Sequence, residues 1–343
     1  MSGPITPSLR ERITPFRVAA GLVVALVVAF VILLKIPSGD YLLLPDVAHP
    51  VAPLVHVAGG KPATDGGELF FVDVLQEKAS EFDVLFPWLH PHSKLLPEKD
   101  LIPPGSNDAA LQQAELRQMA MSQRVAAAVA LRYLGYHVVV RPTGVLVNQI
   151  FLGTDAARTL QPSDVIVAVN GHPTPTVKGL RAIMAKVKPG QTVTLRVVGG
   201  KVTRTVQVTT TADKKSGRAL IGIGVGQSAA ITLPFKVAID SGDIGGPSAG
   251  LAFTLEVMRL LGHDVTHGYK VAATGEINLD GTVTAIGGVE QKTWGVREAG
   301  AQVFLVPVDQ GNAKTAERYA GPDLKIIPVT SLKQALAALA KLK

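Results

Sequence analysis

Ser248 is the residue whose type and surroundings point most directly to chemistry. It lies in the segment DIGGPSAGL, where Gly246 and Pro247 interrupt any strand and an amphipathic helical pattern begins directly afterwards. A serine at the start of a helix lies next to free backbone N–H groups and the positive end of the helix dipole, which can stabilise an oxyanion. The same position suits a helix N-cap, so the serine by itself predicts either a nucleophile or a cap.

A second segment, residues 270–300, supplies a candidate base. Its pattern predicts two short strands and then a helix that opens after two glycines and carries Lys292. A serine hydroxyl is a poor nucleophile until a base removes its proton, and a lysine can be that base only where burial lowers its pKa. Val289 and Trp294 could provide such dry surroundings. Taken alone, Lys292 would be interpreted as an exposed helix lysine.

The GPSAG motif and the later TGEI, IGG and lysine pattern together resemble the proteolytic domain of Lon-type serine–lysine peptidases. The resemblance implies that Ser248 is the nucleophile and Lys292 the general base. It also implies that the hydroxyl of Thr274 orients the lysine, and that Gly246 and Pro247 support the site from the loop before the serine.

The loop before the serine departs from the family at one position. Many Lon-type domains have an acidic residue directly before GPSAG, and this chain has Gly245 there. Asp243 and Asp240 either line the substrate cleft or cap the loop, and we include Asp243 among the supporting site residues. The sequence leaves open whether glycine in place of an acid weakens the activity.

A nucleotide-driven motor is not expected. Full Lon proteases have an ATP-driven unfolding motor, whereas the phosphate-binding pattern G-x-x-x-x-G-K-[ST] occurs nowhere in this sequence. The resemblance therefore implies an ATP-independent peptidase that needs no cofactor and cleaves unfolded, small or loop-exposed polypeptides.

The N-terminal region predicts a membrane-spanning helix. Residues 18–36 are apolar except for Lys35, and at about 1.5 Å per residue the run matches the hydrocarbon core of a bilayer. Several arginines precede it, so the positive-inside rule places residues 1–17 in the cytoplasm and the rest of the chain outside it. A cleaved signal peptide is the alternative, although its apolar region would be shorter.

Residues 136–213 predict a self-contained, β-rich unit with two helices. GTDAARTLQPSDVIVAVNG resembles the middle of a bacterial PDZ domain, and the helix expected at 177–187 matches the helix that forms the PDZ groove. Gly199-Gly200 predicts a two-residue hairpin. PDZ domains bind an extended peptide as an added strand. No GLGF-like loop precedes GVLV, so capture of a peptide's C-terminus is in doubt, and binding of an internal peptide or of none stays open.

The expected fold is α+β, with a transmembrane helix and a Lon-type proteolytic domain into which a PDZ domain is inserted. Within the first part of the proteolytic domain, 51–60 and 68–76 predict a hairpin, and the periodicity of 109–133 predicts a helix closed by Gly135. The predicted boundaries are 1–17 for the cytoplasmic N-terminus, 18–36 for the transmembrane helix, 45–134 for the first part of the proteolytic domain, 136–213 for the PDZ domain and 216–343 for the second part with the dyad.

Composition excludes several other classes. Lys plus Arg (34) exceeds Asp plus Glu (27) by seven, and three of these net charges lie in residues 1–36 and three in 331–343. The nearly neutral body argues against nucleic-acid binding. The absence of cysteine excludes disulfides and a thiolate zinc site. His90 and His92 form an HxH pair that we interpret as surface loop, so no metal site is predicted.

The sequence thus predicts a single-pass, membrane-anchored serine endopeptidase that cleaves polypeptides outside the cytoplasm. Family resemblance adds a possible hexameric ring. The alternative from a different class is a non-catalytic membrane scaffold that presents peptides on the PDZ domain. The joint presence of Ser248, Thr274 and Lys292 favours the enzyme. The physiological substrate, and whether the PDZ domain recruits substrate or blocks the site, cannot be predicted from the sequence.

Overall fold

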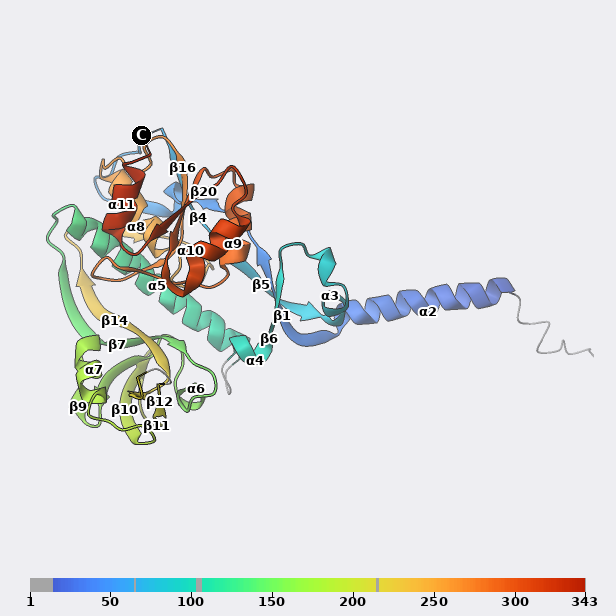
Figure 1. Ribbon diagram of the computed structural model, residues 1–343, viewed down its shortest axis with the longest axis horizontal. Helices are drawn as coiled ribbons and strands as arrows, with labels where there is room; N and C mark the ends of the chain where they lie inside the picture. Colours follow the sequence, from blue (N-terminus) through green and yellow to red (C-terminus); the bar gives the residue numbers. More distant parts are fainter. Residues whose placement is uncertain (1–14, 65, 103–106, 214–215, 343) are drawn as a thin grey trace, which may run out of the picture. The chain divides into compact units, whose positions relative to one another are not determined.

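The computed structural model describes residues 15–64, 66–102, 107–213 and 216–342 (Figure 1). The chain divides into two compact units. The first is drawn from Met1–Leu44 and Gln76–Glu98, and the second from Pro45–Leu75 and Lys99–Lys343.

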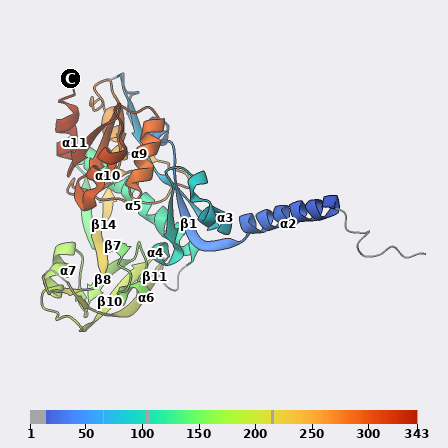
Figure 2. The same ribbon diagram turned by 45° about the vertical axis from the view of Figure 1, so that its right-hand side comes forward.

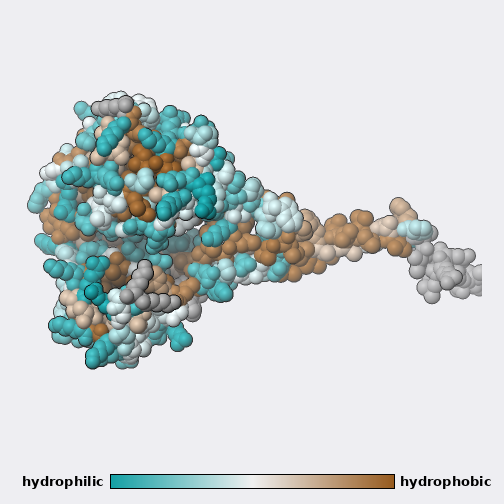
Figure 3. Space-filling view, viewed as in Figure 1, coloured by the Kyte–Doolittle hydropathy of each residue, from teal (hydrophilic) through white to brown (hydrophobic). Residues whose placement is uncertain are grey.

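The first unit contains the apolar helix α2 (Pro15–Lys35), which has no buried residue and appears hydrophobic along its visible face (Figure 3). By length and composition alone this helix could cross a membrane, in agreement with the predicted span. The ring of Phe30 on α2 lies 5.1 Å from that of Phe82 on α3. The other elements are a three-stranded sheet in the order β5-β1-β6 and two short helices: β1 (Pro37–Pro45), β5 (Val74–Ser80), β6 (Lys94–Pro97), α3 (Glu81–Leu85) and η2 (Pro87–Leu89). The short α4 (Glu98–Leu101) lies at the boundary with the second unit.

The second unit is built on a five-stranded sheet in the order β2-β4-β16-β19-β20. All neighbours in it are parallel except the edge pair β2–β4. Figures 1 and 2 show α11 on one side of this sheet and α9 on the other. The strands are β2 (His49–Pro50), β4 (Glu68–Phe71), β16 (Lys270–Ala273), β19 (Val303–Pro307) and β20 (Lys325–Val329), and the helices around them are α5 (Asp108–Tyr133), α8 (Gly250–Leu260), α9 (Val289–Glu298), α10 (Asn312–Tyr319) and α11 (Leu332–Leu339).

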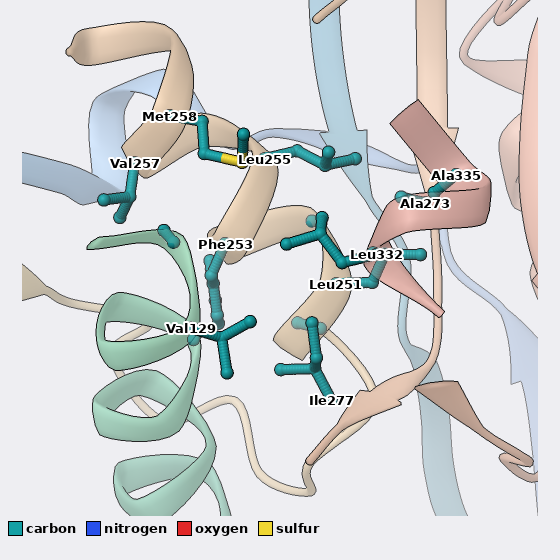
Figure 4. Close-up of a cluster of buried hydrophobic side chains, with 14 of the residues drawn as sticks. Val129, Leu251, Phe253, Leu255, Val257, Met258, Ala273, Ile277, Leu332 and Ala335 are labelled. Carbon is teal, nitrogen blue, oxygen red and sulfur yellow. The ribbon is translucent and has the colours of Figure 1, made fainter. Parts of the chain in front are cut away.

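Successive residues of the central strands enter two different cores. Leu69 and Phe71 of β4 belong to the core that also contains side chains of α5, α8 and α11, shown in Figure 4. Phe70 and Val72 belong to the core formed with α9 and α10. Because side chains alternate across a strand, a run that is apolar at every position marks a strand covered on both faces.

This double burial explains why the predicted hairpin is wrong. The two segments do not pair with each other: β3 (Val55–Val57) pairs with β15 (Val237–Ile239), and β4 pairs with β2 and β16. A strand with two apolar faces is more stable in the middle of a covered sheet than in a hairpin with one solvated face. A 3-10 turn, η1 (Ala52–Leu54), precedes β3.

Helix α5 confirms the helix predicted over 109–133. The side chain of Asn107 caps its first turn by accepting a hydrogen bond from the N–H of Ala110. Gly135 follows its end with φ +87°, the left-handed conformation that glycine adopts without strain. The helix packs against α8, and residues of both lie in one core.

The PDZ segment forms a second sheet in the order β11-β10-β8-β7-β14, with β9 paired to β8. Val145, Leu180 and Leu195 belong to a separate core beneath it. Gly199 still pairs with Val202, so the hairpin turn is Gly200-Lys201, one residue later than predicted. The elements are β7 (Val139–Ile150), α6 (Ala156–Thr159), β8 (Val165–Val169), β9 (His172–Pro173), α7 (Val177–Met184), β10 (Thr192–Gly199), β11 (Val202–Thr209), β12 (Thr211–Ala212), β13 (Ala219–Leu220) and β14 (Ile223–Thr232).

Strands β7 and β14 form a long antiparallel ribbon, paired from Val139–Thr232 to Ile150–Ile223 (Figure 1). The sequence assigns β14 to the proteolytic domain, yet β14 hydrogen-bonds to the PDZ sheet along its whole length and forms one edge of it. The ribbon thus connects the PDZ segment to the strand and loop that lead to Ser248.

Candidate active site

The loop that carries Ser248 is fastened to helix α5. Gly246 has φ +82°, and its N–H donates to the carbonyl oxygen of Glu115 at 2.9 Å. The carbonyl oxygen of Pro247 accepts from the hydroxyl of Ser122 at 3.0 Å and from the N–H of Gly250 at 3.2 Å. Gly246 and Pro247 therefore shape the loop through their backbones.

Ser248 does not cap the helix that follows it. The N-cap of α8 is Ala249, which makes no side-chain capping bond, so the capping alternative is wrong. Instead the Oγ of Ser248 lies 2.7 Å from the Nζ of Lys292 and accepts its hydrogen bond. In the described part of the chain, the backbone N–H groups of Ser248 and Ala249 have no acceptor. They are available to an incoming oxygen atom at the start of α8.

Lys292 is buried, with only 3% of its surface exposed. It lies on α9 one turn after Gly288, whose φ of +67° starts the helix. Burial lowers the pKa of the Lys292 ammonium to about 8, and the negative charge of Asp73 acts in the opposite direction. Val289 is buried as expected, while Trp294 is half-buried with the guanidinium of Arg297 above its ring. The ammonium thus has the dry surroundings that the chemistry requires.

Thr274 contacts the serine rather than the lysine. Its hydroxyl donates to the backbone carbonyl of Ser248 at 3.2 Å, and the N–H of Gly275 donates to the same oxygen at 2.8 Å. Both residues follow directly after β16. The end of this strand therefore holds the backbone of Ser248, and the resemblance-based expectation that Thr274 orients the lysine has no hydrogen bond in the described residues to support it.

Asp243 is not brought to the Ser248–Lys292 pair. It is exposed and forms no hydrogen bond or ion pair among the described residues. Asp240 accepts a hydrogen bond from the N–H of Gly242 at 3.0 Å, which fits the loop-capping interpretation for that residue. At Gly245 an added Cβ would lie 2.7 Å from the Cβ of Glu115. A half-buried glutamate from α5 thus packs where a side chain at position 245 would point.

Three residues near Lys292 were not identified from the sequence. Asp73 follows β4, and the Nε2 of His49 lies 3.2 Å from a carboxylate oxygen of Asp46 and 3.8 Å from one of Asp73. Burial and the charge of Asp46 raise the pKa of Asp73, while His49 and Lys292 lower it. One nitrogen and two carboxylate atoms within 4.8 Å of one another could hold a divalent cation. Such residues carry no local sequence motif, because distant segments bring them together.

The His90–His92 pair lies elsewhere, in the first unit. The Nε2 of His90 contacts a carboxylate oxygen of Asp83 at 2.9 Å, and His92 has φ +64° in a turn. Helix α3 thus supplies an acidic partner for His90.

A small open cleft begins beside the nucleophile loop. Pro247, directly before Ser248, lies on its wall together with Ser122. The TGEI motif contributes its glutamate, Glu276, and strand β7 contributes Asn148. The Nδ2 of Asn148 donates to a carboxylate oxygen of Glu276 at 2.8 Å. This cleft lies next to the loop that carries the serine hydroxyl.

Comparisons with known proteins agree with this arrangement. Residues 235–341 match the family model of the Lon protease (S16) C-terminal proteolytic domain, and residues 132–210 match that of the PDZ domain. The chain is 30% identical over 190 residues to Lon protease of Roseiflexus castenholzii, which covers 52% of this chain and 21% of the relative. Lon protease 1 of Sorangium cellulosum is 30% identical over 142 residues, 38% of this chain and 17% of the relative.

Among solved structures, the PDZ domain of the SdrC-like protein from Listeria monocytogenes is 25% identical and covers 24% of this chain and 87% of that chain, with a TM-score of 0.24. The chain spans only about a fifth of the length of the two Lon relatives. The matches nevertheless include both Ser248 and Lys292 within residues 235–341. This chain therefore resembles a Lon-type proteolytic domain over residues 235–341 and a PDZ domain over residues 132–210.

Proposed function

We propose that the protein is an ATP-independent, membrane-anchored serine endopeptidase that cleaves unfolded or exposed polypeptide segments through Ser248 and Lys292. The observation that carries the proposal is the 2.7 Å contact between the Oγ of Ser248 and the buried Nζ of Lys292, whose pKa is lowered to about 8. A lysine with this pKa is partly deprotonated at neutral pH and can act as a base.

The geometry supports a two-step acyl transfer. The neutral amine of Lys292 takes the proton of Ser248 while Oγ attacks the substrate carbonyl carbon. The carbonyl oxygen becomes an oxyanion that the N–H groups of Ser248 and Ala249 can bind. Lys292 then donates its proton to the leaving amine, and an acyl ester on Oγ remains. Water, deprotonated by the same lysine, hydrolyses that ester and restores the hydroxyl.

Helix α2 supports the membrane anchor, because a helix of 21 residues without a buried side chain has the length and composition for a bilayer. The arginines before it support a cytoplasmic N-terminus. Cysteine introduced at an exposed position of α10 and challenged with a membrane-impermeant thiol reagent on whole cells tests the orientation. Labelling without cell lysis supports an external catalytic domain, and labelling only after lysis contradicts it.

The PDZ segment supports a role in peptide binding. Strand β14 forms an edge of its sheet, and α7 lies beside it, because the N–H of Val177 donates to the side chain of Gln227 at 3.2 Å. An edge strand next to a helix is the arrangement to which a PDZ ligand adds. This observation keeps the scaffold as a second candidate function.

Cleavage of unfolded casein by the full chain in detergent, without nucleotide, distinguishes the two functions. The endopeptidase proposal requires fragments from the parent, the same rate with and without ATP, and no fragments from Ser248→Ala. A scaffold would bind the polypeptide and leave it intact.

A further inference from the structure

The cleft beside the nucleophile loop has walls of mixed character. Its apolar lining comes from α5, from β7 and from β17 (Glu276–Ile277) with the residues that follow it. It comprises Met121, Val125, Leu146, Ile277 and Leu279. Glu276 is the one charged residue that lines it in the described part of the chain. An apolar channel with a single carboxyl group suits a long side chain that ends in a hydrogen-bond donor.

Asn148 and Glu276 both have side-chain oxygens in this cleft that can accept further hydrogen bonds. The Oδ1 of Asn148 is buried without a hydrogen-bond partner among the described residues. Glu276 receives one hydrogen bond, from the Nδ2 of Asn148, and no cationic side chain of the described residues pairs with it. Burial raises the pKa of Glu276 to about 7, and the bond from Asn148 only partly offsets this. A cation placed between these oxygens would satisfy both.

Two other amides of the cleft have hydrogen-bond partners. The Nε2 of Gln227 donates to the carbonyl oxygens of Gly144 and Pro175, each at 2.9 Å, and its Oε1 accepts from the N–H of Val177. The Nε2 of Gln118 donates to the backbone carbonyl of Asn148 at 3.1 Å, which fixes that strand position. Asn148 and Glu276 are bonded to each other and keep acceptor capacity for a ligand.

We propose that this cleft is a subsite of the endopeptidase for a basic residue, in which the substrate's lysine or arginine side chain passes along the apolar walls and binds Glu276 and Asn148. The inference rests on the proposed function. It gives Asn148 a role in substrate specificity. Because Asn148 lies on β7 of the PDZ segment, that segment contributes directly to the substrate cleft.

Cleavage-site mapping tests the subsite. The full chain in detergent digests unfolded casein, and mass spectrometry identifies the cut positions. We expect lysine and arginine to be enriched at one fixed position relative to the scissile bond. Two peptides that differ only by lysine or methionine at that position then measure the preference as a ratio of kcat/KM.

Variants assign the preference to the two residues. Glu276→Gln should lower the lysine-to-methionine ratio at least about tenfold, since a buried charge pair loses its anion. Asn148→Ala should lower the same ratio to a smaller extent. Glu317→Gln, the same change at an exposed position of α10, should leave the ratio unchanged.

The outcomes separate the two proposals. If the parent cleaves nothing, the proposed function fails. If the parent cleaves casein but shows no basic preference, or Glu276→Gln keeps the parent's ratio, the subsite is overturned while the peptidase stands. Circular dichroism of each variant, together with its activity on the methionine peptide, shows that a lost ratio does not come from misfolding.

Discussion

The Nζ of Lys292 lies 2.7 Å from the Oγ of Ser248, although 44 residues separate them in the chain. The serine precedes α8, the lysine is on α9, and the end of β16 holds the serine's backbone through Thr274 and Gly275. Two helices on opposite faces of one sheet thus meet at the end of a central strand. The contact between the two side chains is therefore held by packed secondary-structure elements.

The two residues should act as one unit. We expect Lys292→Ala and Ser248→Ala each to lower kcat/KM for an unfolded substrate by at least about 10⁴-fold, because each removes half of the same proton-transfer step. The double variant should be no worse than either single variant. Initial rates of peptide cleavage measure this, and losses that multiply in the double variant would show that the residues act independently.

Activity should rise with pH through the ionisation of Lys292. Its pKa is lowered to about 8, so the protonated, inactive form predominates at pH 6 and the neutral base at pH 10. Lys292→Arg should be inactive throughout, since a guanidinium keeps its proton. Cleavage rates of the parent and the variant from pH 6 to 10 check this. A flat parent profile, or an active arginine variant, would contradict the assignment of the base.

Burial of this cation should also reduce stability. The pKa of Lys292 is about 8 in the folded state and 10.5 ordinarily. Below pH 8 the lysine is therefore protonated in both the folded and the unfolded state, and burying its charge reduces the free energy of unfolding by roughly 3 kcal/mol. Between pH 8 and 10.5 only the unfolded state stays protonated, and stability rises with pH. We expect Lys292→Met to raise the free energy of unfolding by about 1–3 kcal/mol at pH 7, and less at pH 10.

Urea unfolding of the full chain in detergent, followed by tryptophan fluorescence at both pH values, measures this gain. Lys270→Met provides a matched control, because that lysine is exposed and pairs with Glu68 at the surface. A destabilised Lys292→Met at pH 7, or a gain that does not depend on pH, would contradict the argument.

Much of the fold and site could be predicted because its signals are local. The 3- to 4-residue periodicity of α5 and the capping glycine after it lie in one continuous segment. The GPSAG motif and the TGEI, IGG and lysine pattern likewise predict the pair Ser248 and Lys292, which the structure brings into contact, without knowledge of the fold. Local patterns suffice where one segment determines its own structure.

Long-range pairing could not be predicted in the same way. Asn148 and Glu276 are 128 residues apart, and no sequence pattern indicates that they are in contact. The apolar run of β4 is consistent with a hairpin or a covered central strand, and only its pairing with β16 decides between them. Strand β14 forms an edge of the PDZ sheet but lies after the sequence segment that resembles a PDZ domain. Its pairing with β7 was therefore not predicted.

Restoring the family's acidic residue at Gly245 should impair this protein. A Cβ at that position would lie 2.7 Å from the Cβ of Glu115, so the loop or α5 must shift, at a cost of about 1–3 kcal/mol. Because the same loop is bonded to α5 through Gly246, the shift should displace Ser248. We expect Gly245→Asp to lower both the urea midpoint and kcat/KM.

Two further variants separate steric from charge effects. Gly245→Ala should lose nearly as much as Gly245→Asp, since both carry the same Cβ. Glu115→Gly combined with Gly245→Asp should lose less than the sum of the single changes. Full activity in Gly245→Asp alone would show that the loop accommodates the side chain without strain.

If Lys292 makes Ser248 a nucleophile, Ser248 should react with a serine-directed covalent label only when the lysine is present. A fluorophosphonate reacts when a serine oxygen attacks phosphorus, fluoride leaves and the base takes the proton. Mass spectrometry of the digested full chain, labelled at pH 9 in detergent, locates the adduct. We expect an adduct on Ser248 in the parent and little or none in Lys292→Met. An adduct on another serine, or equal labelling of Ser248 in both proteins, would contradict this expectation.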